Sequence, residues 1–276
     1  MSSVTTRFQS LSREAWQTRP LVPASVMLHA AALGATAWHP PVWPWALGAI
    51  AADHVVVTAM GLWPRSRALG PNVTRLPPHS GAGRVAITID DGPDRNVTPR
   101  VLDILQAAGA RATFFCIGER VSANLDLARE IVGRGHSIQN HSQSHRHHFS
   151  LLGSRGMRRE IETAQQSISV VTGERPRFFR APAGLRNPFL QPVLAALDLQ
   201  LVSWTRRGFD TVKRDAGAVF ARLATGLASE DILLLHDGNA ARSRSGEPVI
   251  LEVLPRLLDA VARADLATVT LPEALP

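Results

Sequence analysis

Two adjacent carboxylates, Asp90 and Asp91, are the first residues of this chain whose types and spacing suggest chemistry. They follow the apolar run 85–89 and precede Gly92 and Pro93, a pair that ends a strand by turn chemistry. Side chains alternate along a strand, so at its end one carboxylate can bind a cation while its neighbour remains free to accept a proton. The same residues also make an ordinary polar turn, and the motif alone leaves both interpretations open.

Two imidazoles four residues apart, His141 and His145, supply the second group. Together with Asp91 they form a three-ligand set that leaves the fourth position of a zinc ion open for water, as in catalytic rather than structural sites. His147 and His148 lie in the same segment, so a histidine-rich polar loop is the competing interpretation.

Two further groups also follow strand-like runs. Residues 180–184 come directly after Phe178 and Phe179, and His236 follows the leucine run 233–235. Polar residues therefore end four candidate strands in turn. In a parallel α/β barrel such positions meet at one face, and this regularity favours a single site over separate turns and loops.

Over residues 84–275 the chain resembles the polysaccharide deacetylase family, the NodB-homology domain of carbohydrate esterase family 4. The resemblance rests on motifs in the family's order, at residues 88–93, 141–145, 180–184, 204–211 and 235–236. It implies a metal-dependent N-deacetylase with a distorted, incomplete barrel and an open groove.

The resemblance also implies roles for single residues. Asp90 matches the catalytic base, and His236 matches the general acid. Asp91, His141 and His145 match the metal triad. The implied cofactor is a divalent metal, for which we expect zinc, with cobalt, nickel or manganese as alternatives.

Three more residues match supporting roles. Arg180 matches the arginine that pairs with the base, Asp210 the aspartate that orients the acid histidine, and the backbone N–H of Ala183 an oxyanion donor. The chain also departs from the family's pattern. Ala183 stands where a tyrosine is usual, Arg207 where an acidic residue is common, and Thr211 where a tryptophan is usual, which puts substrate identity in doubt more than chemistry.

Amide hydrolysis needs an activated water, a stabilised oxyanion and a proton donor for nitrogen. A zinc-type cation lowers the pKa of its bound water toward ~7 and polarises the acyl oxygen. Asp90 would accept the proton of the water, and His236 would protonate the leaving amine. We expect an N-deacetylase acting on an N-acetylated amino sugar. A deformylase or other non-peptide amide hydrolase, and a catalytically silent glycan-binding protein, are the alternatives.

The net charge of +7 suggests nucleic-acid binding, but its distribution argues otherwise. Residues 1–84 carry +5 and the longer remainder only +2, so no nucleic-acid partner is expected. The single cysteine, Cys116, excludes an intrachain disulfide and is expected to be a buried, inert thiol.

Two apolar stretches, residues 21–38 and 42–63, precede the deacetylase-like region. Each is near the length that crosses a ~30 Å hydrocarbon core, the first only marginally, and five of the six tryptophans flank or begin them. We predict a transmembrane hairpin, in which Asp53 must be paired, neutral or facing a polar cavity. Soluble core helices, or one span plus an interfacial segment, are the alternatives.

Arginines flank both stretches, whereas the connecting loop has no lysine or arginine, so the positive-inside rule places both ends in the cytoplasm. The expected order is a cytoplasmic segment 1–20, a membrane hairpin 21–63, a linker 64–83 and the deacetylase domain 84–276. This describes a multi-pass protein of the cell (inner) membrane with a cytoplasmic catalytic domain. Its partners would be the lipid bilayer and an amino-sugar glycan or lipid-linked sugar.

From residue 84 onward, strand-like and helical patterns alternate. Helices are expected at residues 98–108, 121–133, 156–172 and 247–264. Strands are expected at residues 85–89, 112–117, 136–140, 176–181, 199–205, 231–236 and 267–271. The alternation predicts an α/β fold, a distorted (β/α) barrel of about seven parallel strands.

Overall fold

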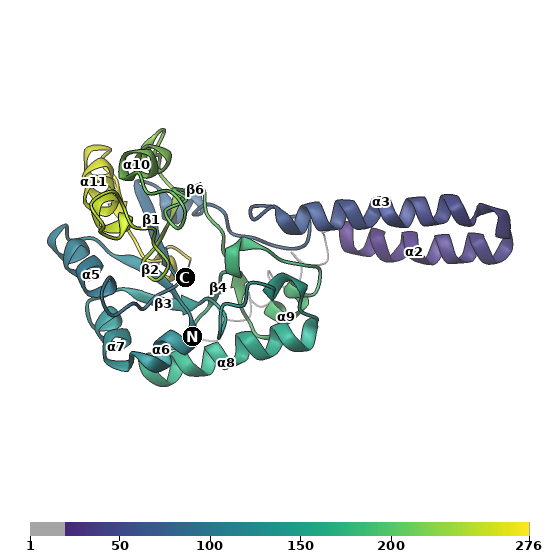
Figure 1. The fold of residues 1–276 in the computed structure, drawn as a ribbon, viewed down its shortest axis with the longest axis horizontal. Helices are drawn as coiled ribbons and strands as arrows, with labels where there is room; N and C mark the ends of the chain where they lie inside the picture. The colour runs from purple at the N-terminus through teal and green to yellow at the C-terminus, as the bar shows by residue number, and fades with distance from the viewer. Residues whose placement is uncertain (1–19, 276) are drawn as a thin grey trace.

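The structure, a computed structural model, describes residues 20–275 of the chain. A pair of long helices projects from an α/β body that contains the sheet (Figure 1). Residues 1–19, which include Trp16 and the first three arginines of the predicted topology, lie outside the described residues.

Parallel strands form one half-barrel in the order β5-β4-β3-β2-β1-β7-β6, and β8 pairs with the start of β1. This confirms the predicted distorted barrel of about seven parallel strands. The sheet stays open between its two edge strands, β5 and β6. The strands are β1 (Arg84–Asp90), β2 (Ala112–Cys116), β3 (Ser137–Asn140), β4 (Phe178–Phe179), β5 (Gln200–Leu201), β6 (Arg206–Arg207), β7 (Ile232–His236) and β8 (Ala267–Thr268).

Helices surround the strands (Figure 1). The longer ones have an apolar stripe that faces the sheet; in α11, for example, Leu254, Leu257 and Val261 are all buried. The helices of the body are α4 (Pro78–Gly81), α5 (Thr98–Ala107), α6 (Gly118–Ala123), α7 (Leu125–Gly133), α8 (Ser154–Thr172), α9 (Leu190–Ala196), α10 (Ala216–Ala224), α11 (Val249–Arg263) and α12 (Leu271–Ala274), with short 3-10 turns η2 (Phe149–Leu151) and η3 (Pro182–Gly184).

The strands send alternate side chains to two different cores. Leu233 and Leu235 of β7 pack with the helices on the outer side, whereas Ile232 and Leu234 pack inside the half-barrel. His236 continues the inward series of β7. Asp90 does the same in β1, after Ala86 and Thr88, and the parallel register places it directly beside His236. Strand alternation therefore delivers both residues to the mouth of the barrel interior.

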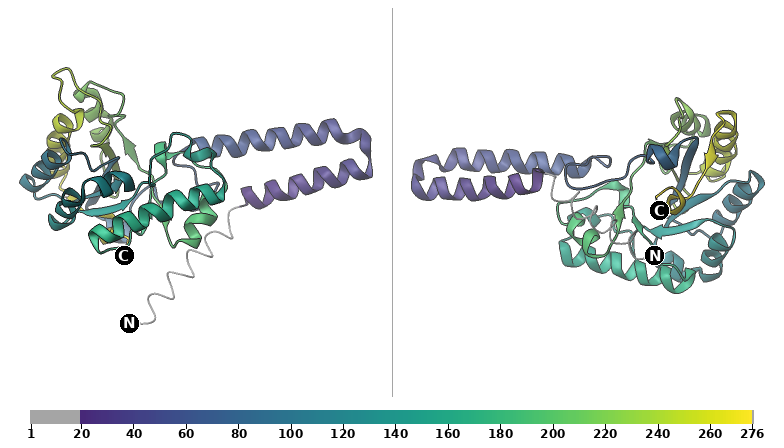
Figure 2. Two further views of the ribbon diagram at one scale, coloured as in Figure 1. Left: turned by 60° about the horizontal axis from the view of Figure 1, so that its bottom comes forward. Right: turned by 180° about the vertical axis from the view of Figure 1, so that it is seen from behind.

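The N-terminal pair of helices comprises α2 (Leu21–Trp38) and α3 (Trp43–Leu62), joined by the short turn η1 (Pro40–Val42). The two helices run side by side and project well beyond the α/β body (Figure 2). Both are long and apolar enough to cross a membrane. Only 6% of the most apolar 18-residue stretch of each helix is buried. Asp53 in α3 accepts a hydrogen bond of 2.6 Å from Ser25 in α2, so the acidic group is paired as expected.

Residues 64–83 run along the open side of the half-barrel. Val73 pairs in parallel with Val202, just after β5, and the buried Leu76 joins the interior core. The carbonyl of Pro64 accepts hydrogen bonds from Ser203 (2.7 Å) and Asn72 (2.9 Å). The segment that connects the helical pair to the catalytic region is therefore packed against the sheet.

Gly61, near the end of α3, is in direct contact with the body. Its carbonyl accepts a hydrogen bond of 3.1 Å from the N–H of Arg186, and an added Cβ would lie 2.2 Å from the Arg186 carbonyl oxygen. We predict that Gly61→Ala lowers the free energy of unfolding by about 1 to 3 kcal/mol, because backbone must move to accept the methyl group. Gly48→Ala in the same helix is the control, since no atom lies within 4 Å of its added Cβ. Equal melting temperatures of the two variants in detergent would contradict the prediction.

Candidate active site and metal centre

A buried ion pair lies at the centre of the site. Nη1 of Arg180, which follows β4, donates to Oδ1 of Asp90 at 2.6 Å and to Thr88 Oγ1 at 2.8 Å. Its Nη2 donates to the carbonyl of Ser203 at 2.8 Å, and the guanidinium lies 4.1 Å above the ring of Phe115. Burial lowers the pKa of Arg180, whereas Asp90 opposes that shift. The ion pair holds Oδ1 of Asp90 in place, whereas Oδ2 is not bonded to Arg180.

Three metal-ligating side chains converge beside this pair. One ligand atom each from Asp91, His141 and His145 can be chosen so that all lie within 4.8 Å of one another. The Nε2 atoms of both histidines are 3.2 Å from Oδ1 of Asp91. That oxygen is buried and has no hydrogen-bond partner among the described residues. This is expected of an oxygen that binds a metal cation. The donor set of two imidazoles and one carboxylate fits a zinc-type divalent metal.

Neighbouring groups orient the three ligands. The Nδ1 atom of His141 lies 2.8 Å from the carbonyl oxygen of Arg180, which directs Nε2 toward Asp91. Asp91 has φ of 75° and His145 has φ of 46°, both in the left-handed region. The turn at Asp91 brings its carboxylate to the same side as Asp90 although the two are neighbours in sequence. Burial alone would raise the pKa of Asp91, but interactions with His141 hold this pKa well below its usual range.

On the other side of Asp90, His236 is paired with Asp210. The Nδ1 atom of His236 lies 2.8 Å from Oδ1 of Asp210, and the backbone N–H of His236 donates to Oδ2 at 2.7 Å. Burial alone would lower the pKa of His236, but the buried carboxylate of Asp210 overcomes this and raises it to about 9. The imidazole is therefore protonated at neutral pH and can donate a proton.

The side chains of Asp90, Asp91, His141, His145 and His236 line one cavity of about 620 Å³. Ala183, the predicted oxyanion donor, lines it with φ of 55°, and Thr211 and Arg207 lie on the wall. The structure thus brings together in one cavity the predicted residues Asp90, Asp91, His141, His145, Ala183 and His236, with Arg180 and Asp210 bonded directly behind them. Their individual catalytic roles remain predictions.

Two residues that sequence reasoning missed support Asp91. Asn239 donates from Nδ2 to Oδ2 of Asp91 at 2.8 Å, and Arg120 donates to its backbone carbonyl at 2.8 Å. Arg120 also donates to Oδ1 of Asn239 at 3.2 Å, which closes a small network around the ligand. Asn239 lies three residues after His236, in the loop that follows β7, and this proximity was the only available signal.

The side chain of Asp237 is a second group near the site that the sequence did not predict. Asp237 is buried behind Asp91, and its side chain is hydrogen-bonded to the hydroxyl of Thr98. Burial raises the pKa of Asp237 to about 7. The carboxyl group therefore supports the wall behind the site without adding a full negative charge there.

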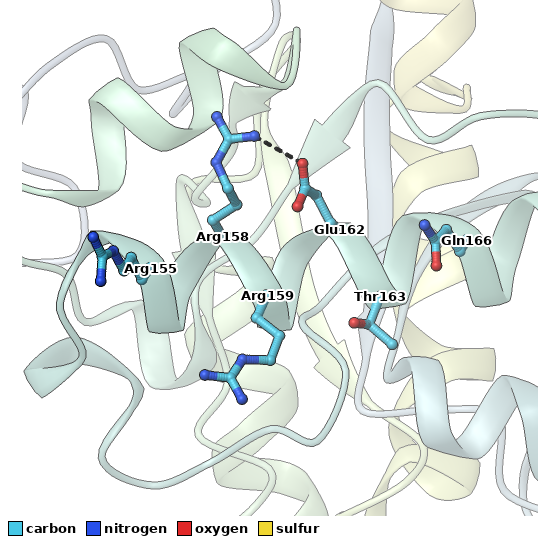
Figure 3. Close-up of a pocket in the computed structure, with 6 residues that line it drawn as sticks. All are labelled: Arg155, Arg158, Arg159, Glu162, Thr163 and Gln166. Atoms are coloured by element: carbon cyan, nitrogen blue, oxygen red, sulfur yellow. Dashed lines mark hydrogen bonds and ion pairs between the residues drawn. The ribbon is translucent and has the colours of Figure 1, made fainter.

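Another hollow lies on the outer surface of α8 (Figure 3). It is formed by Arg155, Arg159 and the ion pair of Arg158 with Glu162, whose atoms are 2.8 Å apart. The hollow holds one carboxylate and no imidazole or thiol, so it lacks the donors of a metal centre. The cavity at the barrel mouth is the candidate active site.

Comparison with known proteins agrees with this geometry. The sequence profile of the family described as "Polysaccharide deacetylase" matches residues 79–202. A peptidoglycan-N-acetylglucosamine deacetylase of Bacillus cereus is 34% identical over 175 residues, which cover 63% of this chain and 81% of that protein. A chitooligosaccharide deacetylase of Sinorhizobium fredii is 33% identical over 167 residues, covering 59% and 77% of the two chains.

A solved structure resembles the body in both sequence and fold. The family 4 carbohydrate esterase from Streptomyces lividans, in complex with acetate, superposes with a TM-score of 0.61 and 31% identity, covering 68% of this chain and 92% of that chain. This chain belongs to the polysaccharide deacetylase family and is a hydrolase of carbon–nitrogen bonds other than peptide bonds. The profile match begins after the helical pair and ends before Asp210 and His236.

We predict that metal binding and proton transfer can be separated by substitution. The double variant Asp91→Ala, His141→Ala should lose its metal and its activity, because two of three ligands are gone. Asp90→Asn is the matched control: it should abolish turnover but keep nearly full metal occupancy, since it removes a proton acceptor and no ligand. Metal content by mass spectrometry and acetate release are measured on the same samples. Full activity and one bound zinc in the double variant would refute the assignment.

We predict that Asp210 sets the basic limb of the pH profile. With a pKa near 9, His236 is protonated at neutral pH and loses its proton as pH rises through that value. Asp210→Asn removes the largest of the interactions that oppose burial, so the pKa of His236 falls and the basic limb of kcat/KM should move to lower pH by at least about one unit. An unchanged limb would mean that another group donates the proton.

Proposed function

We propose that this chain is a membrane-anchored, divalent-metal N-deacetylase that hydrolyses the acetamide of an N-acetylglucosamine unit in an envelope glycan or its lipid-linked precursor. The observation that carries the proposal is one cavity holding a metal triad, a base paired with a buried arginine and a protonated histidine. The sugar is suggested by relatives named for N-acetylglucosamine and chitooligosaccharide deacetylation.

The metal, held by Asp91, His141 and His145, would supply Lewis-acid polarisation of the acyl oxygen and a more acidic water. Asp90 would take the proton from the attacking water through Oδ2, because its Oδ1 is engaged by Arg180. The ion pair also keeps Asp90 ionised and fixed in orientation.

His236 would then protonate the departing nitrogen. The imidazolium is maintained by Asp210, in the way that a buried carboxylate supports the histidine of a hydrolase triad. Ala183 would contribute its backbone N–H to the oxyanion. Base and acid lie on adjacent strands, with Asp90 paired to His236 in the β1–β7 register, so both can reach one bound amide.

We predict that the purified full-length protein releases acetate from N-acetylated chito-oligosaccharides, that chelation abolishes the release, and that zinc or cobalt restores it. Formate release from an N-formyl analogue is measured in parallel. Greater activity on the formyl substrate would favour a deformylase. A protein that binds glycan and metal but releases neither acid would be a silent binding protein.

The helical pair is proposed to anchor the enzyme, with the catalytic domain 84–276 on the cytoplasmic side. Two long apolar helices with a paired Asp53 and an uncharged connection support a hairpin. We predict that reporters fused after Arg19 and after Pro276 both report the cytoplasm. Export of the C-terminal reporter alone would show that only one helix spans the membrane, and wall polymer would become the leading substrate.

A further inference from the structure

Arg207 is a cation of the active-site cavity that no acidic side chain neutralises. It is half-buried in β6, and no ion pair joins it to any residue of the part of the chain that the structure describes. Its Nε atom is buried and has no hydrogen-bond partner there. The preceding residue shows the contrast, because Arg206 points to the opposite face of β6 and pairs with Asp231 at 2.5 Å.

Aromatic rings hold the Arg207 guanidinium in position. Its Cζ lies 5.2 Å from the centre of the Trp204 ring and 5.0 Å from that of Phe209. Stacking of this kind restrains the long side chain without using its N–H donors. The donors of Arg207 are therefore oriented in advance and remain available to a ligand.

The other charged groups lining the cavity are already engaged or lie at its edge. Asp90 is paired with a buried arginine, and Asp91 belongs to the metal triad. Arg120 is bonded to the backbone of Asp91. Glu119 is exposed to solvent. The charge of Arg207 reaches the catalytic centre, where it contributes, after burial, to the lowered pKa of the buried arginine.

The wall of the cavity also meets the end of the helical pair. Pro64, two residues after α3 ends, packs against Gly184, where an added Cβ would lie 2.7 Å from Pro64 and 2.6 Å from Trp204. Gly184 and Trp204 both line the cavity. With α3 in a bilayer, this wall lies close to the level of the lipid headgroups.

We infer that Arg207 forms an anion-binding subsite for the phosphoryl group of a lipid-phosphate-linked N-acetylated amino sugar. A guanidinium presents two parallel N–H donors that match phosphate oxygens, and a sugar attached to a lipid phosphate carries its acetamide within a few bonds of that anion. This inference rests on the proposed function and specifies its substrate class.

The test compares charged and neutral substrates on the full-length protein in detergent. Acetate release is measured for N-acetylglucosamine 1-phosphate, for its short-chain prenyl ester and for neutral N,N′-diacetylchitobiose. In the wild type we expect kcat/KM to be higher for both phosphates than for the neutral disaccharide. In Arg207→Gln the ratio of phosphate to neutral kcat/KM should fall roughly 10- to 100-fold, the loss expected for a charge-assisted hydrogen-bonded pair.

Three further variants isolate the charge. Arg207→Lys should retain part of the preference, because it keeps a cation without the planar fork. Arg207→Met keeps much of the apolar stem, so a preference that survives in this variant would show a packing role and overturn the inference. Arg159→Gln removes an exposed arginine from the α8 hollow and should leave the ratio unchanged.

The outcomes separate this inference from the proposed function. Deacetylation of the neutral disaccharide with no phosphate preference would overturn the subsite and leave the deacetylase intact. A preference that depends on Arg207 for N-acetylglucosamine 1-phosphate but not for the prenyl ester would assign the subsite to a soluble sugar phosphate and overturn the lipid-linked class. Release of acetate from none of the substrates would refute the proposed function itself.

Discussion

The rest of the site depends on the buried pair of Arg180 and Asp90. Two charges removed from water are tolerated only when their hydrogen-bonding groups are satisfied, and Arg180 achieves this through Asp90, Thr88 and the carbonyls of Val202 and Ser203. These partners belong to β1 and to the chain after β5, on opposite sides of the half-barrel interior. The guanidinium thereby links β1 to the segment after β5, which no strand pairing joins directly, and it fixes the carboxylate on which the proposed chemistry relies.

The metal ligands depend on the same arrangement. The carbonyl of Arg180 lies against Nδ1 of His141, so the residue that pairs with the proposed base also orients a proposed metal ligand. Asp91, His145 and Ala183 all have positive φ, a conformation that costs energy for residues other than glycine. Backbone strain is thus present where the chain leaves its strands to enclose the site. The hydrogen bonds around these turns offset that cost.

The sequence predicts those parts of the fold whose signals repeat over many residues. The inward series Ala86, Thr88, Asp90 and the apolar stripe of α11 follow from alternation and helical periodicity, and the parallel half-barrel follows from their order. Very short strands, and contacts that depend on the rest of the fold, leave no such repeating pattern in the sequence. β6 has two residues, and the segment around Val73 lies against the sheet through backbone bonds that no side-chain pattern specifies. The support of Asp91 by Asn239 is a contact between distant segments, visible only in three dimensions.

The close packing of Pro64 on Gly184 limits where the enzyme can work. A catalytic domain on a long flexible tether samples a deep shell above the bilayer, whereas this one is joined to its helices through an ordered segment that packs against the cavity wall at Gly184. With the hairpin in a membrane, the cavity would keep a nearly constant height above the bilayer and a nearly constant tilt relative to it. The position of an acetamide along a glycan would then become a criterion of selection in its own right: the first sugars above the lipid would be in reach, and later ones would be excluded by distance alone.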